Sequence, residues 1–220
     1  MKTLSILFLF FTAPAWSAPE QPLVNCRLIC LQASPGSPTS IFAGPAEAAV
    51  RCDLPREELS RPVKLPIMDG KIVFRTAMDA APIAIASIPA GKDGGLLLFL
   101  PSSDAETEPA YKVLVLDDSA TGLPTDGSLV FNACPANLRF LIGEQRGTPT
   151  PGQITSVKRP QKRNEFQMCG VSFQIQSGES WRTTYESMLR FPENQHRLFV
   201  AFIDPMSKLP GLRVLRFSPR

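Results

Sequence analysis

Histidine and charge are both scarce in this chain. Its 220 residues include one histidine, and charged residues make up 20%, below the usual share of about 25%. The sequence contains no phosphate-binding glycine loop, zinc-protease helix motif or serine-hydrolase elbow. No apolar run approaches the roughly 20 residues that a membrane-spanning helix needs. We therefore expect no cofactor, no metal site and no transmembrane segment in the mature chain.

Proline, in contrast, is abundant. There are 22 prolines against 14 glycines, and proline interrupts helices because it lacks the backbone N–H. This composition argues against a mostly helical protein. Because 44% of the residues are apolar, the chain is also too hydrophobic to be wholly disordered. It should fold around a buried core.

The N-terminus has the layout of a secretory signal peptide. Lys2 supplies the positive charge, Leu4 to Phe11 form the apolar segment, and Ala15-Trp16-Ser17 is a small-x-small cleavage site. We expect residues 1–17 to be removed and the mature chain to be exported, periplasmic or extracellular. A lipoprotein with Cys26 as its lipidated first residue is the alternative.

Short β-branched and aromatic runs, separated by proline and glycine, are typical of an all-β sandwich or barrel. Alternation predicts that Cys169 and Phe173 share a buried strand face, and that Trp181 and Tyr185 share a face of the next strand. The expected strands are 23–31, 40–42, 48–52, 71–75, 83–88, 96–100, 111–116, 128–132, 138–142, 153–157, 166–176, 181–190, 197–203 and 212–217. Helical signal is confined to 46–54 and to one turn at 56–59.

Two of the runs, 113–116 and 198–203, are apolar on both faces, as in central strands that are covered on both sides. We therefore predict an antiparallel β-sandwich, immunoglobulin-like or related, in two packed lobes. One large sandwich is the alternative. The polar segment 102–109 marks the boundary, which gives an N-terminal lobe at 18–109 and a C-terminal lobe at 110–220.

The cysteine count is odd, and in an exported chain cysteines are read as disulfides before zinc ligands. If Cys26 and Cys30 share a strand, their Cα atoms lie about 13 Å apart, too far to bond to each other. We expect one bridge within the set Cys26, Cys30 and Cys52, and a second between Cys134 and Cys169. The alternative is that all are buried and reduced, as small apolar side chains often are.

Acidic residues and the single histidine are the candidates for chemistry. Asp117, Asp118 and Asp126 flank one loop, where paired carboxylates could serve acid–base catalysis or bind a cation. The same residues are also ordinary turn formers. His196 is the one imidazole that a nucleophilic mechanism could use, but no other catalytic signature accompanies it, so a surface histidine is the plainer interpretation.

Two further features are candidate binding surfaces. Trp181 and Tyr185 could stack against a sugar ring, although large aromatic side chains more often lie in the core. The loop 147–165 carries the basic residues Lys158, Arg159, Lys162 and Arg163. The second half holds 14 basic and 9 acidic residues, a bias that could attract anionic envelope polymers but is too dilute for nucleic acid. A solvated loop is the plainer interpretation.

The stretches Tyr111-Lys-Val-Leu-Val-Leu-Asp-Asp-Ser119 and Pro124-Thr-Asp-Gly-Ser-Leu-Val-Phe-Asn132, followed by Arg139, Gly143 and Pro151-Gly152, resemble uncharacterised exported β-rich proteins of environmental bacteria, notably Verrucomicrobia-like groups. The resemblance covers the second half of the chain. It implies export and a sandwich-like domain, and it carries no established activity. Asn132, at the end of its strand, is expected to hold a neighbouring loop through side-chain hydrogen bonds.

Three functional hypotheses follow, and the absence of a catalytic constellation favours the first. It is a non-enzymatic envelope module that binds an envelope polymer or another envelope protein, or has a structural role. The second is a secreted hydrolase or glycan-active enzyme that uses Asp117 and Asp118. The third is an accessory subunit or chaperone of a surface assembly, whose strand edges accept a partner strand.

Overall fold

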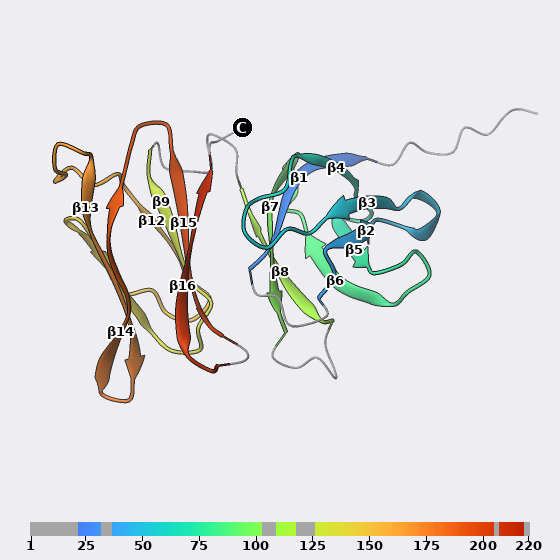
Figure 1. Ribbon diagram of the computed structural model, residues 1–220. Coiled ribbons are helices and arrows are strands. Elements are labelled where there is room, and N and C mark those ends of the chain that lie inside the picture. The colour runs from blue at the N-terminus through green and yellow to red at the C-terminus, as the bar shows by residue number, and fades with distance from the viewer. Residues whose placement is uncertain (1–21, 32–36, 103–108, 118–125, 205–206, 218–220) are drawn as a thin grey trace, which may run out of the picture.

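The computed structural model describes residues 22–31, 37–102, 109–117, 126–204 and 207–217 (Figure 1). The expected signal peptide and Asp118 lie outside these ranges. The described part of the chain is all-β and contains no α-helix. The segment expected to be helical at 46–54 forms only the 3-10 turn η1 (Ala46–Ala48) and then enters a strand.

The strands agree closely with the sequence pattern. In the first half they are β1 (Leu23–Cys30), β2 (Ser40–Ala43), β3 (Val50–Asp53), β4 (Val63–Pro66), β5 (Lys71–Arg75), β6 (Pro82–Ser87), β7 (Gly94–Pro101) and β8 (Tyr111–Leu116). In the second half they are β9 (Ser128–Asn132), β10 (Leu138–Ile142), β11 (Gln145–Gly147), β12 (Ile154–Val157), β13 (Met168–Ser177), β14 (Ser180–Arg190), β15 (His196–Ile203) and β16 (Pro210–Phe217). Sequence reasoning missed β4 and β11. Both are short edge strands, and β4 ends in a proline, which only an edge strand tolerates well.

The strands form four sheets that pack in pairs. Sheets β4-β1-β7-β8 and β3-β2-β5-β6 enclose one core, centred on Phe74 and Phe99. Sheets β12-β9-β15-β16 and β11-β10-β13-β14 enclose a second core, around Phe173 and Phe199. The predicted β-sandwich lobes are confirmed, whereas an immunoglobulin-like subtype is not. β8, which follows the expected boundary at residue 109, pairs with β7 in the first sandwich.

A third core joins the two sandwiches. Leu96 and Leu98 of β7 point away from the first core and pack with Leu198 and Val200 of β15. The two middle sheets are therefore buried on both faces, and the molecule is a stack of four sheets (Figure 1). Across this junction Arg213 Nη1 donates a hydrogen bond of 2.9 Å to the Leu31 carbonyl oxygen. This arrangement explains why β7 and β15 are apolar at nearly every position.

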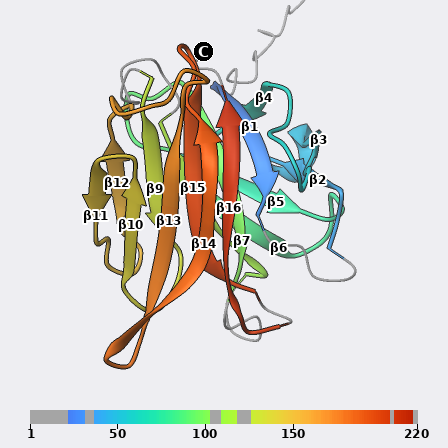
Figure 2. The same cartoon turned by 60° about the vertical axis from the view of Figure 1, so that its left-hand side comes forward.

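The two sandwiches share one topology. Adding eight to each strand number of the first sandwich reproduces the strand order of both sheets of the second. The parallel pair recurs as well, because β1 lies beside β7 as β9 lies beside β15. The main departure is the β13–β14 hairpin, with strands of 10 and 11 residues where β5 and β6 have 5 and 6. Figure 2 shows this hairpin running past the neighbouring strands of its sheet.

Asn132 connects the end of β9 to the loop that follows, as its position at a strand end predicted. Its side chain is fully buried. The amide nitrogen donates to the carbonyl oxygens of Ala136 and Pro149, at 2.9 and 3.0 Å, and the amide oxygen accepts from the backbone N–H of Cys134 at 3.0 Å. One side chain thus satisfies three backbone groups around β9 and β10.

Candidate functional site

The solvent-facing side of the sheet β11-β10-β13-β14, called here the outer face, carries two adjoining hollows. The first hollow has a volume of about 660 Å³. Its lining includes Leu141, Glu144, Arg146, Lys162, Gly170, Ser172, Glu186 and Met188. The second, of about 500 Å³, includes Arg139, Gln174 and Thr148. The two share Leu141, Arg146 and Ser172 in their walls. They therefore form one continuous depression across the sheet.

The floor of the first hollow is apolar although it faces water. Leu141 of β10 is 43% exposed and Met188 of β14 is 51% exposed. On β13, which separates these two strands, Ser172 is the register partner of Leu141 and Gly170 is that of Met188. A β-carbon at Gly170 would meet only the Met188 sulfur, at 3.9 Å. The missing side chain therefore opens the hollow.

The rim of the first hollow is charged and partly fixed. Gly143, with φ +58°, allows the tight turn between β10 and β11 that presents Glu144. The Glu144 carboxylate accepts the backbone N–H groups of Gln161 and Lys162, at 2.7 and 3.2 Å. The Gln161 bond is the main cause that lowers the pKa of Glu144 to about 2. The carboxylate is therefore ionised at physiological pH and attaches the 158–165 segment to the sheet.

The second hollow ends at a stacked pair. The Arg139 guanidinium lies over the indole of Trp181, 4.5 Å from the ring centroid, and its Nε donates to Gln174 Oε1. Gln174 Nε2 in turn donates to Thr183 Oγ1 at 3.0 Å. Three strands, β10, β13 and β14, therefore contribute one cluster of planar polar and aromatic side chains.

The prediction that Trp181 and Tyr185 share a face is wrong. The β13–β14 ladder shifts register between Phe173 and Gln174, and a β-bulge of this kind reverses the alternation beyond it. Tyr185 pairs with buried Phe173, and the two rings meet edge to face at 6.4 Å inside the core. Trp181 instead joins Arg139 on the outer face.

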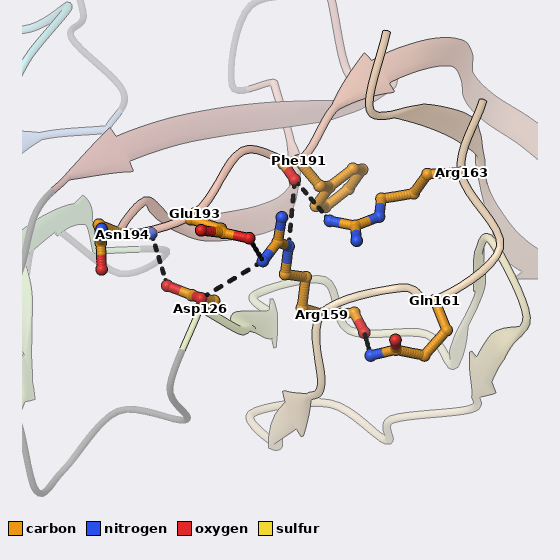
Figure 3. Close-up of polar contacts among 7 residues, drawn as sticks. All are labelled: Asp126, Arg159, Gln161, Arg163, Phe191, Glu193 and Asn194. Carbon is orange, nitrogen blue, oxygen red and sulfur yellow. Dashed lines mark hydrogen bonds and ion pairs between the residues drawn. The ribbon is translucent and has the colours of Figure 1, made fainter. Parts of the chain in front are cut away.

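The four basic residues of the 158–163 loop have two different roles. Arg159 Nε and Arg163 Nη1 both donate to the backbone carbonyl oxygen of Phe191, at 3.2 and 2.9 Å (Figure 3). Arg159 Nη1 also lies 3.5 Å from the Asp126 carboxylate and 3.3 Å from that of Glu193. These two arginines hold the loop in place.

The two lysines of the loop, Lys158 and Lys162, keep exposed side chains, and only Lys162 borders the first hollow. The loop therefore presents much less free positive charge to solvent than its sequence suggests.

A third arginine, which sequence reasoning missed, lies beside this loop. Arg197 is 2% exposed and its guanidinium stacks on the ring of Phe191 at 4.4 Å. Nη2 donates to the Arg190 carbonyl oxygen and, at 2.9 Å, to Gln195 Oε1. Burial is the main cause that lowers the pKa of Arg197 to about 10. Its charge is therefore satisfied mainly by neutral oxygens and an aromatic ring.

The candidate catalytic groups do not converge on a shared hollow. Asp117 forms an ion pair of 2.6 Å with Lys92. Asp126, with φ +53°, lies in a turn, but its carboxylate accepts the Asn194 N–H at 2.6 Å and binds Arg159. These contacts join distant parts of the chain and are not the local turn bonds expected of it. Asp117, Asp126 and His196 line neither hollow of the outer face. They are also absent from the walls of two further hollows, one beside Arg51 and one beside Phe202.

His196 is only 5% exposed, so the expectation of a surface histidine is wrong. Its ring stacks on that of Phe217, with 5.7 Å between the ring centroids. Burial lowers its pKa, against an opposing effect of Asp126. The neutral imidazole is therefore favoured, and it packs as part of the junction between the two sandwiches.

The predicted disulfides are absent. All five cysteines, Cys26, Cys30, Cys52, Cys134 and Cys169, are buried, and none forms a disulfide. Burial raises the pKa of the Cys52 and Cys134 thiols to about 12. The alternative of reduced, core-forming cysteines describes the structure.

The described ranges contain neither a metal-binding cluster nor a membrane-spanning helix. No group of three or more histidine, cysteine, aspartate or glutamate side chains there is arranged to hold a metal ion. Likewise, no helix within those ranges has the length and hydropathy to cross a membrane.

Comparison with known proteins adds no relatives. No protein-family model matches the chain, and no curated protein is similar enough in sequence to count as a match. The candidate site therefore rests on the geometry of this chain alone.

Proposed function

We propose that this protein is an exported, non-enzymatic binding module of the bacterial envelope, and that the outer face is where it holds an extended ligand. The observation that carries the proposal is the pair of adjoining hollows, which share Leu141, Arg146 and Ser172 and cross all four strands of the sheet. A shallow, apolar-floored depression with a polar rim suits recognition of a chain-like molecule. The signal peptide pattern supports export.

The rigidity of the outer face supports the same function. The hollows lie on sheet strands, and the 158–165 segment beside them is fastened at Glu144 and at the Phe191 carbonyl. A surface that is ordered before it binds avoids the entropy cost of ordering on contact. An extended ligand would therefore meet a preformed site.

The enzymatic hypothesis has less support. Asp117 and Asp126 are each engaged by a basic side chain, and His196 is packed against Phe217. General acid–base catalysis needs such groups to face a common substrate position. The described residues offer no such meeting point.

The strand-accepting hypothesis meets a similar difficulty. The long edge strand β14 carries a bulge at Thr183 and Thr184 and the charged residues Arg182, Glu186 and Arg190. Bulges and charges on an edge are the features that oppose pairing with another chain. We therefore assign binding to the face of the sheet and not to its edge.

The test is co-sedimentation of the full mature chain with insoluble envelope polymer that has been freed of protein and lipid. Replacing Leu141 and Met188 together by serine should weaken binding about 30-fold, because each apolar side chain covered by a ligand contributes roughly 1 kcal/mol. The matched control is Ile85→Ser, which changes a 43% exposed apolar residue on the opposite outer sheet. Equal binding by the double variant and the control, or no sedimentation at all, would refute the proposal.

A further inference from the structure

We infer that the two hollows are consecutive subsites for an uncharged oligosaccharide chain. This inference rests on the proposed function and names the chemical class of its ligand. It departs from the anionic polymer that the basic sequence of the 158–163 loop suggests. Three properties of the outer face carry it: the balanced charge of the first hollow, an apolar floor within a mixed polar rim, and length.

The charges at the first hollow cancel. Arg146 and Lys162 are matched by Glu144 and Glu186. The two arginines of the loop, Arg159 and Arg163, both donate to the Phe191 carbonyl oxygen (Figure 3). Neither of them lines a hollow of the outer face. A polymer of one charge sign would meet attraction and repulsion in the same space. An uncharged ligand meets neither.

The polar groups of the rim include both donors and acceptors. Arg146 and Lys162 donate, Glu186 accepts, and the hydroxyl of Ser172 does both. Sugar hydroxyls likewise donate and accept, and they surround a ring whose C–H face is apolar. Leu141 and Met188 supply an apolar floor of matching character, 43% and 51% exposed. A saccharide ring satisfies the floor and the rim together.

The depression is longer than one ring. Beyond the shared wall residue Ser172, the second hollow continues to Arg139 and Gln174, which contact Trp181 and Thr183. The second hollow is lined by Arg139 and Arg146, and planar guanidinium groups donate several hydrogen bonds at once to neighbouring oxygen atoms. We therefore place at least one further sugar unit on this side.

The test is titration of the full mature chain with uncharged hexasaccharides, using cellohexaose, xylohexaose, mannohexaose, maltohexaose and chitohexaose as probes. At least one should bind with a dissociation constant below about 1 mM. Because the ligand carries no charge, the constant should change less than about twofold between about 0.05 and 0.5 M sodium chloride. Hexagalacturonate, poly-L-glutamate and poly-L-lysine are the charged comparisons.

Gly170 offers a blocking variant with a matched control. Gly170→Leu should fill the first hollow and weaken sugar binding at least about tenfold, because the position is open apart from the Met188 sulfur at 3.9 Å. Gly170→Ala adds one methyl group and should change the affinity less than about threefold. Circular dichroism of both variants checks that the sheet is retained.

Two variants that each remove one positive charge, one at the rim of the first hollow and one on the 158–163 loop, test whether binding depends on a specific side chain. Arg146→Gln should weaken binding about tenfold through the loss of a charge-assisted hydrogen bond. Lys158→Gln removes an equal charge from an exposed side chain that does not line the hollow, and it should leave the affinity unchanged. Equal losses in the two variants would mean unspecific charge attraction and would overturn the inference.

The remaining outcomes separate the inference from the proposed function. If envelope polymer sediments the protein but no uncharged hexasaccharide binds below about 1 mM, the sugar assignment is wrong and the binding module stands. If hexagalacturonate, poly-L-glutamate or poly-L-lysine binds more tightly than every uncharged hexasaccharide, the sugar assignment is likewise wrong and the binding module stands. If neither polymer nor sugar binds, both proposals fail.

Discussion

The guanidinium of Arg139 and the indole of Trp181 stack across the width of β13, with 4.5 Å between the guanidinium carbon and the ring centroid. They come from β10 and β14, which are not neighbours in the sheet. The bulge near Thr183 makes the contact possible, because it turns Trp181 to the face on which Arg139 lies.

This stack should be visible in tryptophan emission. The two tryptophans of the sequence are Trp16 and Trp181, and Trp16 lies in the expected signal peptide. Arg139→Gln removes the covering cation, so we expect the emission of the mature chain to move to longer wavelength as water reaches the ring. Fluorescence spectra of the variant and of Arg146→Gln, which leaves the stack intact, make the comparison. An unchanged Arg139→Gln spectrum would contradict the geometry.

Glu144 should make the 158–165 segment sensitive to acid. Its pKa falls from 4.5 to about 2, so the carboxylate stabilises the folded protein fully above pH 4.5. That contribution is lost as the pH falls from 4.5 towards 2. The amide proton shift of Gln161, followed by NMR, should titrate with a midpoint near 2. In Glu144→Gln the titration should vanish; a midpoint near 4.5 in the native chain would mean that the two backbone bonds are not formed.

The five cysteine thiols should be inert in the folded protein. Burial raises the pKa of Cys52 and Cys134 to about 12, and the thiolate is the reactive form. Iodoacetamide at pH 8 should label none of the five within minutes, as read by intact mass. In guanidinium chloride all five should react. Fewer than five labels after denaturation would reveal a disulfide that the structure does not contain.

Removing the Asn132 side chain should be costly for its size. Asn132→Ala leaves the Ala136 carbonyl oxygen and the Cys134 N–H without this partner, whereas the Pro149 oxygen keeps the Leu138 N–H at 3.1 Å. Each buried group left unsatisfied costs about 1–3 kcal/mol, so we expect a loss of about 3 kcal/mol in urea unfolding. Asn137→Ala, which removes a part-buried bond to Gln176, should cost less than half as much.

The two sandwiches should unfold together. Leu198 is fully buried in the core that joins them, so Leu198→Ala should destabilise the protein by about 2–5 kcal/mol. Calorimetry should show a single unfolding transition that shifts to lower temperature without splitting. The reason is that the two middle sheets are buried against each other, so opening the junction exposes both. Ile85→Ala, at an exposed position, is the control and should stay within about 0.5 kcal/mol of the native chain. Two separate transitions would show that the junction is weak.

Much of the architecture could be predicted because it depends on short-range patterns. Alternation in the run from Cys169 to Ile175 identified one buried face correctly, and the doubly apolar run at 198–203 identified a strand covered on both sides. Such patterns follow from the two-residue period of a strand. They need no knowledge of which strands are neighbours.

The candidate site could not be predicted in the same way. A single bulge moved Trp181 to the opposite face from Tyr185, and nothing in the local sequence distinguishes it from an unbroken strand. Leu141, Arg146 and Met188 come together only through the pairing of β10, β11, β13 and β14. Alternation in β10 could have shown that Leu141 points outward, but not what lies beside it.

The shared topology was also invisible in the sequence. The two halves agree in strand order and in their parallel pair, while their hairpins differ in length. Packing demands an apolar side chain at a buried position but accepts many kinds. Strand order can therefore persist where residue identity does not.

The joining core has a practical consequence for anyone who wishes to transplant the outer face. Cutting the chain between β8 and β9 would bare Leu96 and Leu98 on one piece and Leu198 and Val200 on the other. An exposed apolar sheet face of that kind aggregates or associates with another copy of the chain. The second sandwich is therefore unsuited to use on its own. A sensor or fusion protein that uses the outer face has to contain both sandwiches.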